Sequence, residues 1–281
     1  MEAKKKPAVI TGAARGIGRA TAVALAKDGA DIYGIDILDK QSDIVEFEKS
    51  TEADVEETRK LVEQADGKFY FSQGDIRSAE QLAKIAEDVK QKFGTVDIIV
   101  ANAAVQLFSP FIDSTAEHWD LTLDTNLKGT VHSLQAFLPM MVPQNKGKVV
   151  IISSTQGMRG LRWGSAYSAS KWGLIGLTKS LALELGENHI NVNAVVPGLI
   201  NTKLTRNQRR WQMAMGEGYE NKHVTEEEVK EKLSKDDALG IPWLEAEDVA
   251  PVVAFLCSPK AGKITGAVYD VAAGTSAIYT S

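Results

Sequence analysis

The segment VITGAARGIGRATAVALA, residues 9–26, decides the fold because it joins an apolar run to a glycine-rich turn and a helical pattern. Gly12, Gly16 and Gly18 give the turn the spacing G-x-x-x-G-x-G. Glycines let a backbone turn tightly and approach a pyrophosphate, which then lies at the positive end of the following helix. The alternative interpretation is an ordinary tight strand–helix turn. The turn lacks the GK[ST] triplet, which disfavours a P-loop nucleoside triphosphatase.

Short β-rich runs alternate with longer helical patterns along the rest of the chain. The expected strands are 8–11, 31–36, 68–73, 96–102, 148–153, 190–195 and 267–271. Several are almost continuously apolar, as in strands that helices cover on both faces. The alternation predicts an α/β fold of the single-domain Rossmann type, with a doubly wound parallel sheet of about seven strands and helices on both faces. We expect one domain over 1–281, with insertions at about 38–66 and a substrate lid at about 203–243.

Composition and charge exclude several classes of protein. The chain is 44% hydrophobic and 25% charged, which is typical of a soluble globular protein. Its net charge of -5 disfavours a nucleic-acid partner. No apolar run reaches the roughly 18 residues of a membrane span, and no signal peptide is recognisable, so we expect a cytoplasmic protein without a membrane partner. The single cysteine, Cys257, is expected to be a small buried residue, and the four scattered histidines predict no metal site.

Asp36 ends the second expected strand, close to the distance from the glycine turn at which a carboxylate binds an adenosine ribose. Capping of a loop or helix is the alternative role for such a residue. A carboxylate here would accept hydrogen bonds from the ribose hydroxyls of NAD and repel the 2′-phosphate of NADP. Arg15 would instead favour NADP, because an arginine in the turn could bind that phosphate. We give Asp36 more weight and expect NAD, with NADP less favoured.

With these features and the pair Tyr167/Lys171 in YSASK, the chain resembles a short-chain dehydrogenase/reductase over nearly its whole length. The similar motifs are TGAARGIG (11–18), GDI (74–76), NAA (102–104), TNLKG (125–129), ISS (152–154), YSASK (167–171) and PGLINT (197–202). Ala104 stands where the family has glycine, and VAAG near the C-terminus also departs from the family pattern. The two insertions resemble the carveol-dehydrogenase-like, mycofactocin-associated branch. That resemblance implies tight cofactor binding and, often, cyclic or terpenoid alcohols as substrates.

The resemblance also implies roles for individual residues. Tyr167 would be the general acid/base and Lys171 the cation that favours its phenolate and binds the nicotinamide ribose. Ser154 would bind the reacting oxygen. Asn126, which the sequence pattern places within one long helix, would anchor a water molecule that leads protons from Lys171 to solvent. Cofactor contacts are expected at Gly12, Arg15, Gly16, Ile17, Gly18, Asp36, Ile37, Asp75, Ile76, Asn102, Ala103, Ala104, Tyr167, Lys171, Pro197, Gly198, Ile200 and Thr202, and substrate contacts at Ser154, Gln156 and Tyr167.

The expected activity is therefore reversible hydride transfer between a secondary alcohol, cyclic or otherwise apolar, and NAD. The lid residues Trp211, Met213, Met215 and Tyr219 could line an apolar pocket opposite Gln156, Met158 and Trp163, or could simply pack within the protein. The family resemblance implies a homotetramer. The competing interpretation is a non-catalytic NAD-binding sensor or scaffold, since a fold alone does not determine function.

Overall fold

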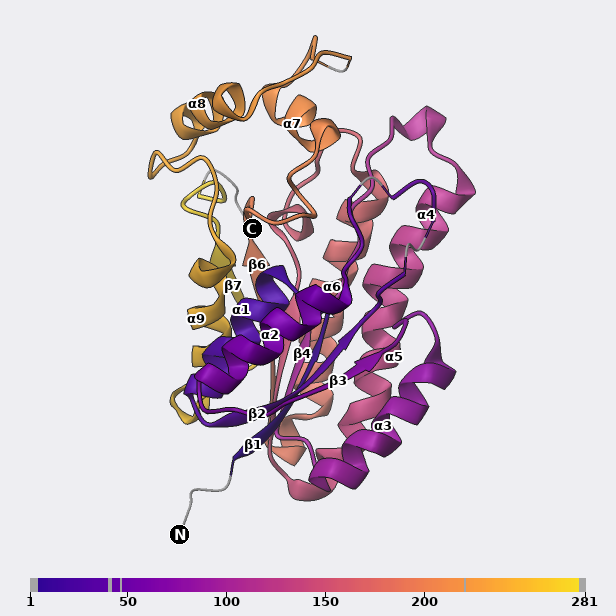
Figure 1. The fold of residues 1–281 in the computed structure, drawn as a ribbon, viewed down its shortest axis with the longest axis vertical. Helices are drawn as coiled ribbons and strands as arrows, with labels where there is room; N and C mark the ends of the chain where they lie inside the picture. The colour runs from indigo at the N-terminus through magenta and orange to yellow at the C-terminus, as the bar shows by residue number, and fades with distance from the viewer. Residues whose placement is uncertain (1–4, 40–41, 46, 220, 278–281) are drawn as a thin grey trace.

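The computed structural model describes residues 5–39, 42–45, 47–219 and 221–277. Residues 40, 41, 46 and 220 of the two expected insertions, and the chain ends 1–4 and 278–281, lie outside the described residues. Within this part of the chain, parallel strands form one seven-stranded sheet in the order β3-β2-β1-β4-β5-β6-β7 (Figure 1). The strands are β1 (Lys6–Thr11), β2 (Ala30–Asp36), β3 (Phe69–Gln73), β4 (Ile98–Ala101), β5 (Gly147–Ile152), β6 (Ile190–Pro197) and β7 (Val268–Val271). The doubly wound parallel sheet predicted from the sequence is confirmed.

The central strands are apolar because both of their faces are covered. In β1 and β4 nearly every side chain is buried, and the register places Ile10 beside Val100 of β4 and Gly34 of β2. The order of the strands reverses between β1 and β4. The chain therefore leaves these two strands toward opposite faces, which opens a crevice at their carboxyl ends.

Two layers of helices cover the sheet (Figure 1). Helices α1 (Gly16–Lys27), α2 (Glu52–Gln64) and α9 (Ala246–Cys257) bury the apolar side chains of one face. Helices α3 (Ala79–Phe93), α5 (Gly129–Phe137) and α6 (Ser165–Glu184) cover the other, with α4 (Ala116–Leu123) packed against α6. Cys257 in α9 is buried as expected, and this burial raises the pKa of its thiol to about 12.

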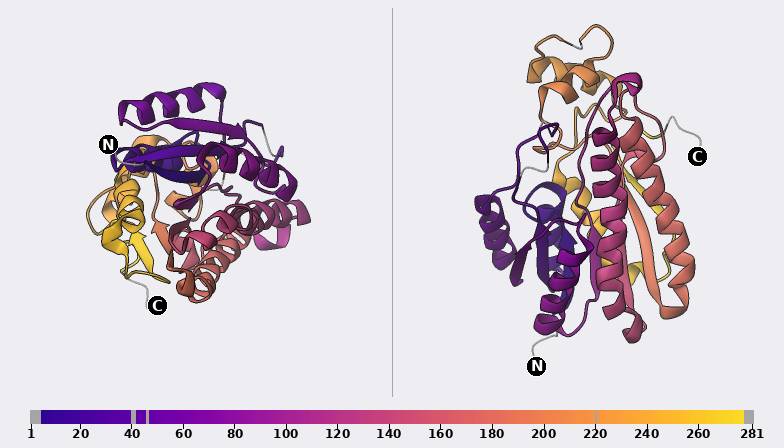
Figure 2. Two further views of the ribbon diagram at one scale, coloured as in Figure 1. Left: turned by 90° about the horizontal axis from the view of Figure 1, so that it is seen from below. Right: turned by 90° about the vertical axis from the view of Figure 1, so that its right-hand side faces the viewer.

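The two expected insertions contain helices. The first contains α2, whose start is fixed by a capping box: the Asp54 N–H donates to Thr51 Oγ1 at 3.2 Å, and the Thr51 N–H donates to the Asp54 carboxylate at 3.0 Å. The second contains α7 (Gln208–Met215) and α8 (Glu226–Asp236). Figure 2 shows these two helices at the opposite end of the molecule from the start of β1, beyond the carboxyl ends of the strands. None of the helices in the described ranges is both long and apolar enough to span a bilayer.

Candidate active site

A cleft of about 860 Å³ lies at the carboxyl ends of the strands, where ligands bind in doubly wound sheets. Its walls come from the glycine turn, the ends of β2, β4, β5 and β6, the start of α6, and the lid. The predicted site residues that line it are Gly12, Arg15, Gly16, Ile17, Asp36, Ile37, Asp75, Ile76, Asn102, Ala103, Ala104, Ser154, Gln156, Tyr167, Lys171, Pro197, Gly198, Ile200 and Thr202. Gly18 and Asn126 are not among the residues that line it.

The glycine turn is packed directly against the end of β4. The Asn102 side-chain amide donates hydrogen bonds to the carbonyl oxygens of Thr11 (3.0 Å) and Gly12 (3.1 Å). Gly12 has a φ of +67°, and a Cβ there would lie 2.8 Å from Asn102 Nδ2 and 2.9 Å from the Cα of Ala103. A Cβ on Gly18 would lie 2.0 Å from the Gly12 carbonyl oxygen, so Gly18 allows α1 to begin directly under the turn. Side chains at Gly12 and Gly18 would therefore destroy the shape of the turn.

Asp36 points into the cleft from the end of β2, and backbone groups hold its carboxylate. The Ala14 N–H donates to one oxygen at 2.9 Å and the Ile37 N–H donates to the other at 2.8 Å. Burial raises the pKa of Asp36, while these two hydrogen bonds and the charge of Arg15 act to lower it. The carboxylate is thus fixed in position beside the glycine turn.

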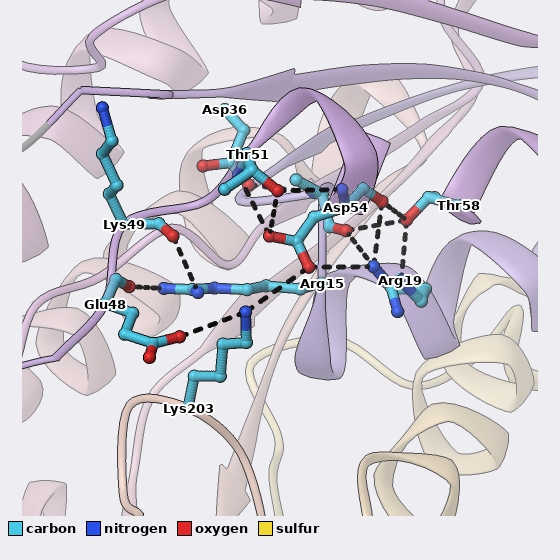
Figure 3. Close-up of polar contacts among 10 residues, drawn as sticks. Arg15, Arg19, Asp36, Glu48, Lys49, Thr51, Asp54, Thr58 and Lys203 are labelled. Atoms are coloured by element: carbon cyan, nitrogen blue, oxygen red, sulfur yellow. Dashed lines mark hydrogen bonds and ion pairs between the residues drawn. The ribbon is translucent and has the colours of Figure 1, made fainter. Parts of the chain in front are cut away.

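Arg15 is bound by the loop that precedes α2 (Figure 3). Its guanidinium donates hydrogen bonds to the carbonyl oxygens of Glu48 and of Lys49, the latter at 3.2 Å. Lys203 from the lid forms ion pairs with Glu48 (3.3 Å) and Asp54 (3.8 Å) in the same cluster. Burial lowers the pKa of Arg15, and the nearest carboxylates, with Asp54 first, raise it. The glycine turn, the first insertion and the lid therefore meet at one polar cluster on the rim of the cleft.

Asp75 is held by a neighbouring arginine. Its carboxylate receives hydrogen bonds from Arg77 Nε at 2.8 Å and from Arg77 Nη2 at 2.6 Å. This pair fixes the carboxylate on the wall of the cleft next to Ile76.

Tyr167 and Lys171 lie one turn apart at the start of α6, and both are buried, with 5% and 2% of their surfaces exposed. Lys171 Nζ lies 5.5 Å from the centre of the Tyr167 ring and donates to the Ile152 carbonyl oxygen at 3.0 Å. Burial raises the pKa of Tyr167 to about 12, against the effects of a hydrogen bond with Ser154 and the charge of Arg210. Burial also lowers the pKa of Lys171 to about 7.

The consecutive serines at the end of β5 point in different directions, as strand alternation predicts. The Ser153 hydroxyl donates to the Lys171 carbonyl oxygen at 2.9 Å. The Ser154 hydroxyl accepts a hydrogen bond from the Gln156 N–H at 3.2 Å and contacts the Tyr167 phenol. Ser154, Tyr167 and Lys171 thus converge on one point of the cleft, where proton transfer to a bound oxygen is chemically feasible.

Asn126 differs from the expectation in its local structure. The sequence pattern places it within one long helix, whereas it occupies a π-helical turn (Asp124–Lys128) between α4 and α5. Its amide oxygen accepts from the Val105 N–H at 2.8 Å, and its amide nitrogen donates to the Val105 carbonyl (3.0 Å) and to Ser170 Oγ (3.1 Å). Asn126 therefore connects the segment after β4 to α6, the helix that carries Tyr167 and Lys171.

The lid wall of the cleft differs from the expected set of residues. Met213 and Gln156 line the cleft, whereas Trp211, Met215, Tyr219, Met158 and Trp163 are not among its lining residues. The sequence reasoning missed Val45, Phe47, Arg159, Leu161, Arg210, Leu233, Ile241 and Trp243, which do line it. These residues belong to irregular segments and short helices, where no periodic pattern indicates which side chains face inward.

Comparison with known proteins gives a consistent result. A family model described as short chain dehydrogenase matches residues 6–213. The (-)-trans-carveol dehydrogenase of Rhodococcus erythropolis is 35% identical over 272 residues, which cover 96% of both chains. A crystal structure of carveol dehydrogenase from Mycobacterium avium in complex with NAD superposes with a TM-score of 0.91 at 33% identity, covering 96% of this chain and 97% of that one. A short chain dehydrogenase from Mycobacterium paratuberculosis bound to NAD gives 0.86 at 33% identity, covering 97% and 98%.

Proposed function

The chain belongs to the short-chain dehydrogenase/reductase family, and from this premise we propose that it is an NAD-dependent oxidoreductase that interconverts a secondary alcohol and its ketone. We propose a cyclic or otherwise apolar substrate and a single catalytic domain. The observation that carries the proposal is the convergence of Ser154, Tyr167 and Lys171 on one point of the cleft. A protein that only binds a dinucleotide has no physical need for this convergence.

The cleft fits a nicotinamide dinucleotide. Gly12 and Gly16 leave the turn without side chains where a pyrophosphate would approach the start of α1, and Asp36 is fixed where it could accept hydrogen bonds from ribose hydroxyls. Asn102 and Thr202 would complete the walls around the cofactor. When bound, NAD supplies the carbon that accepts the hydride.

The preference for NAD over NADP is supported by the contacts of two charged residues. The Asp36 carboxylate is held in the cleft by two backbone N–H groups, so its charge would oppose a 2′-phosphate. Arg15, which could otherwise bind that phosphate, donates to the carbonyl oxygens of Glu48 and Lys49.

In the proposed mechanism Tyr167 accepts the hydroxyl proton of the alcohol, and it returns a proton to the carbonyl oxygen in the reverse direction. Ser154 donates a hydrogen bond to the reacting oxygen and stabilises the charge that develops there. In its protonated form Lys171 contributes positive charge beside the phenol, which favours the phenolate. Asn126 acts indirectly, by holding α6 against the segment after β4.

Tyr167→Phe tests this proposal. The variant removes only the phenolic hydroxyl, so we expect turnover to fall by about 10²–10⁴-fold, the usual size of general acid–base catalysis, while NAD remains bound. Turnover is measured on a panel of cyclic alcohols with NAD and an artificial electron acceptor, and bound NAD by mass spectrometry of the denatured protein. Tyr33→Phe is the matched control, because Tyr33 is also buried but its hydroxyl contacts Ser72 and Asp88, away from the cleft.

Near-normal turnover in Tyr167→Phe would refute the mechanism. A wild-type protein that binds NAD but oxidises no alcohol of the panel would instead favour the non-catalytic sensor or scaffold.

We also propose that the chain forms a homotetramer. Helix α6 leaves two large apolar side chains, Trp172 and Leu183, 53% and 85% exposed on its outer surface. Burial of such residues in a subunit contact would remove apolar surface from water. Light scattering coupled to size-exclusion chromatography measures the mass directly, and a monomeric mass at micromolar concentration would refute this assembly.

A further inference from the structure

Arg210 lies in the lid helix α7 and lines the substrate side of the cleft. Its backbone N–H donates to Asn207 Oδ1 at 2.9 Å, so the start of the helix fixes the position of the residue. Its guanidinium carbon lies 5.8 Å from the centre of the Phe108 ring. The Nε atom is buried, and the guanidinium has no hydrogen bond or ion pair with any residue that the structure describes.

The surroundings of Arg210 contain positive charge and the catalytic phenol. Arg210 and Tyr167 line the same cleft, and the charge of Arg210 acts to lower the pKa of Tyr167. Arg159 adds a second positive charge, and no carboxylate of the described residues is among the groups that act on Arg210. Arg210 as a whole is only partly exposed, and its Nε lies out of contact with solvent and without a partner. A charged group withdrawn from water in this way is normally paired in proteins.

The carboxylates that line the cleft are bound elsewhere. Asp36 is held by backbone N–H groups, Asp54 lies in the cluster with Lys203, and Asp75 is paired with Arg77. Asp39 accepts a hydrogen bond from the Gln73 side chain at 2.9 Å, and Asp237 accepts one from the Leu239 N–H at 2.8 Å. The negative charge that would balance Arg210 is therefore best supplied by a ligand.

We propose that Arg210 binds a carboxylate of the substrate, and that the substrate is a hydroxy acid whose apolar body separates the carboxylate from the reacting carbinol carbon. This inference rests on the proposed oxidoreductase function. A guanidinium presents a planar set of N–H donors that matches the two oxygens of a carboxylate. Leu161, Met213 and Trp243 line the same cleft and supply contacts for the apolar body. Arg210 is then a specificity-determining residue at the opposite end of the substrate from Tyr167.

The first test compares trans-4-hydroxycyclohexane-1-carboxylate with its methyl ester. For the wild type we expect kcat/KM to favour the acid, and Arg210→Gln to reduce this preference by about tenfold to a hundredfold, the size expected for losing a charge-assisted hydrogen bond. Both substrates share the same alcohol, so any effect of Arg210 on Tyr167 cancels in the ratio. Arg209→Gln is the matched control, because its guanidinium lies 4.9 Å from the Trp163 ring and does not line the cleft.

The second test measures binding without turnover. Calorimetry in the presence of NAD is carried out with benzoate, cyclohexanecarboxylate and octanoate, and with cyclohexanecarboxamide as the neutral comparison. We expect at least one carboxylate to bind the wild type and Tyr167→Phe about equally, and to bind Arg210→Gln at least about tenfold more weakly.

The outcomes of the two tests separate the two proposals. Carboxylate binding that depends on Arg210, with no oxidation of any alcohol, would refute the oxidoreductase function and leave the anion site intact. In the first test, the role of Arg210 would be overturned if the wild type oxidised the ester as well as the acid, or if Arg209→Gln lost the preference for the acid to the same extent. In the second test, it would be overturned if the amide bound as tightly as the carboxylates, or if no carboxylate bound.

Discussion

Replacement of Asp36 by asparagine isolates the charge that we propose selects NAD. The side chain keeps its size and one oxygen that can still accept the N–H of Ala14 or Ile37, so the turn should keep its shape. The negative charge, however, is removed. We therefore expect the ratio of kcat/KM with NADP to kcat/KM with NAD to rise.

The size of the change follows from the position of the carboxylate. Two unit charges 4 Å apart repel by about 1 kcal/mol in water and about 4 kcal/mol at the effective dielectric constant of about 20 found near protein surfaces. Asp36 is partly exposed at the cleft, which places it between these limits. Since about 1.4 kcal/mol corresponds to a factor of ten, the ratio should rise by between roughly fivefold and a thousandfold.

The assay is initial-rate kinetics with each cofactor and the same alcohol, and Asp39→Asn is the control. Asp39 also lines the cleft, but its carboxylate accepts a hydrogen bond from the Gln73 side chain at 2.9 Å. An unchanged ratio in Asp36→Asn, or an equal change in Asp39→Asn, would refute the assignment of Asp36. Asp36→Ala adds a stability measurement, because it leaves the Ala14 N–H without its acceptor and should cost about 1–3 kcal/mol in the free energy of unfolding.

Two further predictions concern the buried Lys171 and Gly12 of the glycine turn. Burial lowers the pKa of Lys171 to about 7, whereas the ordinary pKa of a lysine is near 10.4. Between about pH 7 and pH 10.4, the unfolded chain therefore binds a proton on this lysine that the native protein lacks. In urea unfolding of the cofactor-free protein, the free energy of unfolding should therefore rise with pH across this window, relative to Lys171→Met, by up to about 1.4 kcal/mol per pH unit. Parallel curves of the free energy of unfolding against pH for the two proteins would contradict this. Gly12→Ala should destabilise the protein more than Gly94→Ala and abolish NAD binding. Both glycines have positive φ, at +67° and +72°, but only at Gly12 would the added Cβ meet neighbouring atoms, so equal costs in urea unfolding would show that the clash is unimportant.

The parts of the structure that the sequence predicts well are those in which local pattern determines geometry. Continuous apolar runs predict buried strands, and the glycine turn fixes how β1 passes into α1. Asp36, Ser154 and Tyr167 were predictable as members of one cleft because each lies at the end of a strand or the start of a helix. In a parallel sheet all such positions meet at the same edge. Cooperation of these residues in catalysis remains a prediction until the variants are measured.

The π-helical turn at Asp124–Lys128 was not predictable in the same way. A π turn shifts the hydrogen-bonding pattern by one residue without requiring glycine or proline, so the helical periodicity continues through it almost unchanged. Its consequence is large, because it turns the Asn126 amide toward Val105 and Ser170. A helix with regular hydrogen bonding throughout would present this side chain at a different angle to the segment after β4.

The lid shows most clearly where local pattern stops determining function. The stretch RNQRRWQMAM, residues 206–215, has three arginines that are equivalent in composition and charge. In the structure Arg206 pairs with Glu226, Arg209 lies over the Trp163 ring, and Arg210 enters the cleft. Glu226 lies 20 residues from Arg206 in the sequence, and Trp163 is more distant still from Arg209. One helical step separates Arg209, which lies over Trp163, from Arg210, which lines the cleft. The same holds for Arg15, whose charge suggests a phosphate ligand but whose acceptors are backbone carbonyls of the first insertion. Every residue carries such a carbonyl, so no residue type in the sequence marks the contact. A charged residue in the sequence indicates that a ligand could be bound there. Only the contacts that the lid and the first insertion make in the folded chain show which charged side chains already have protein partners and which can bind a substrate.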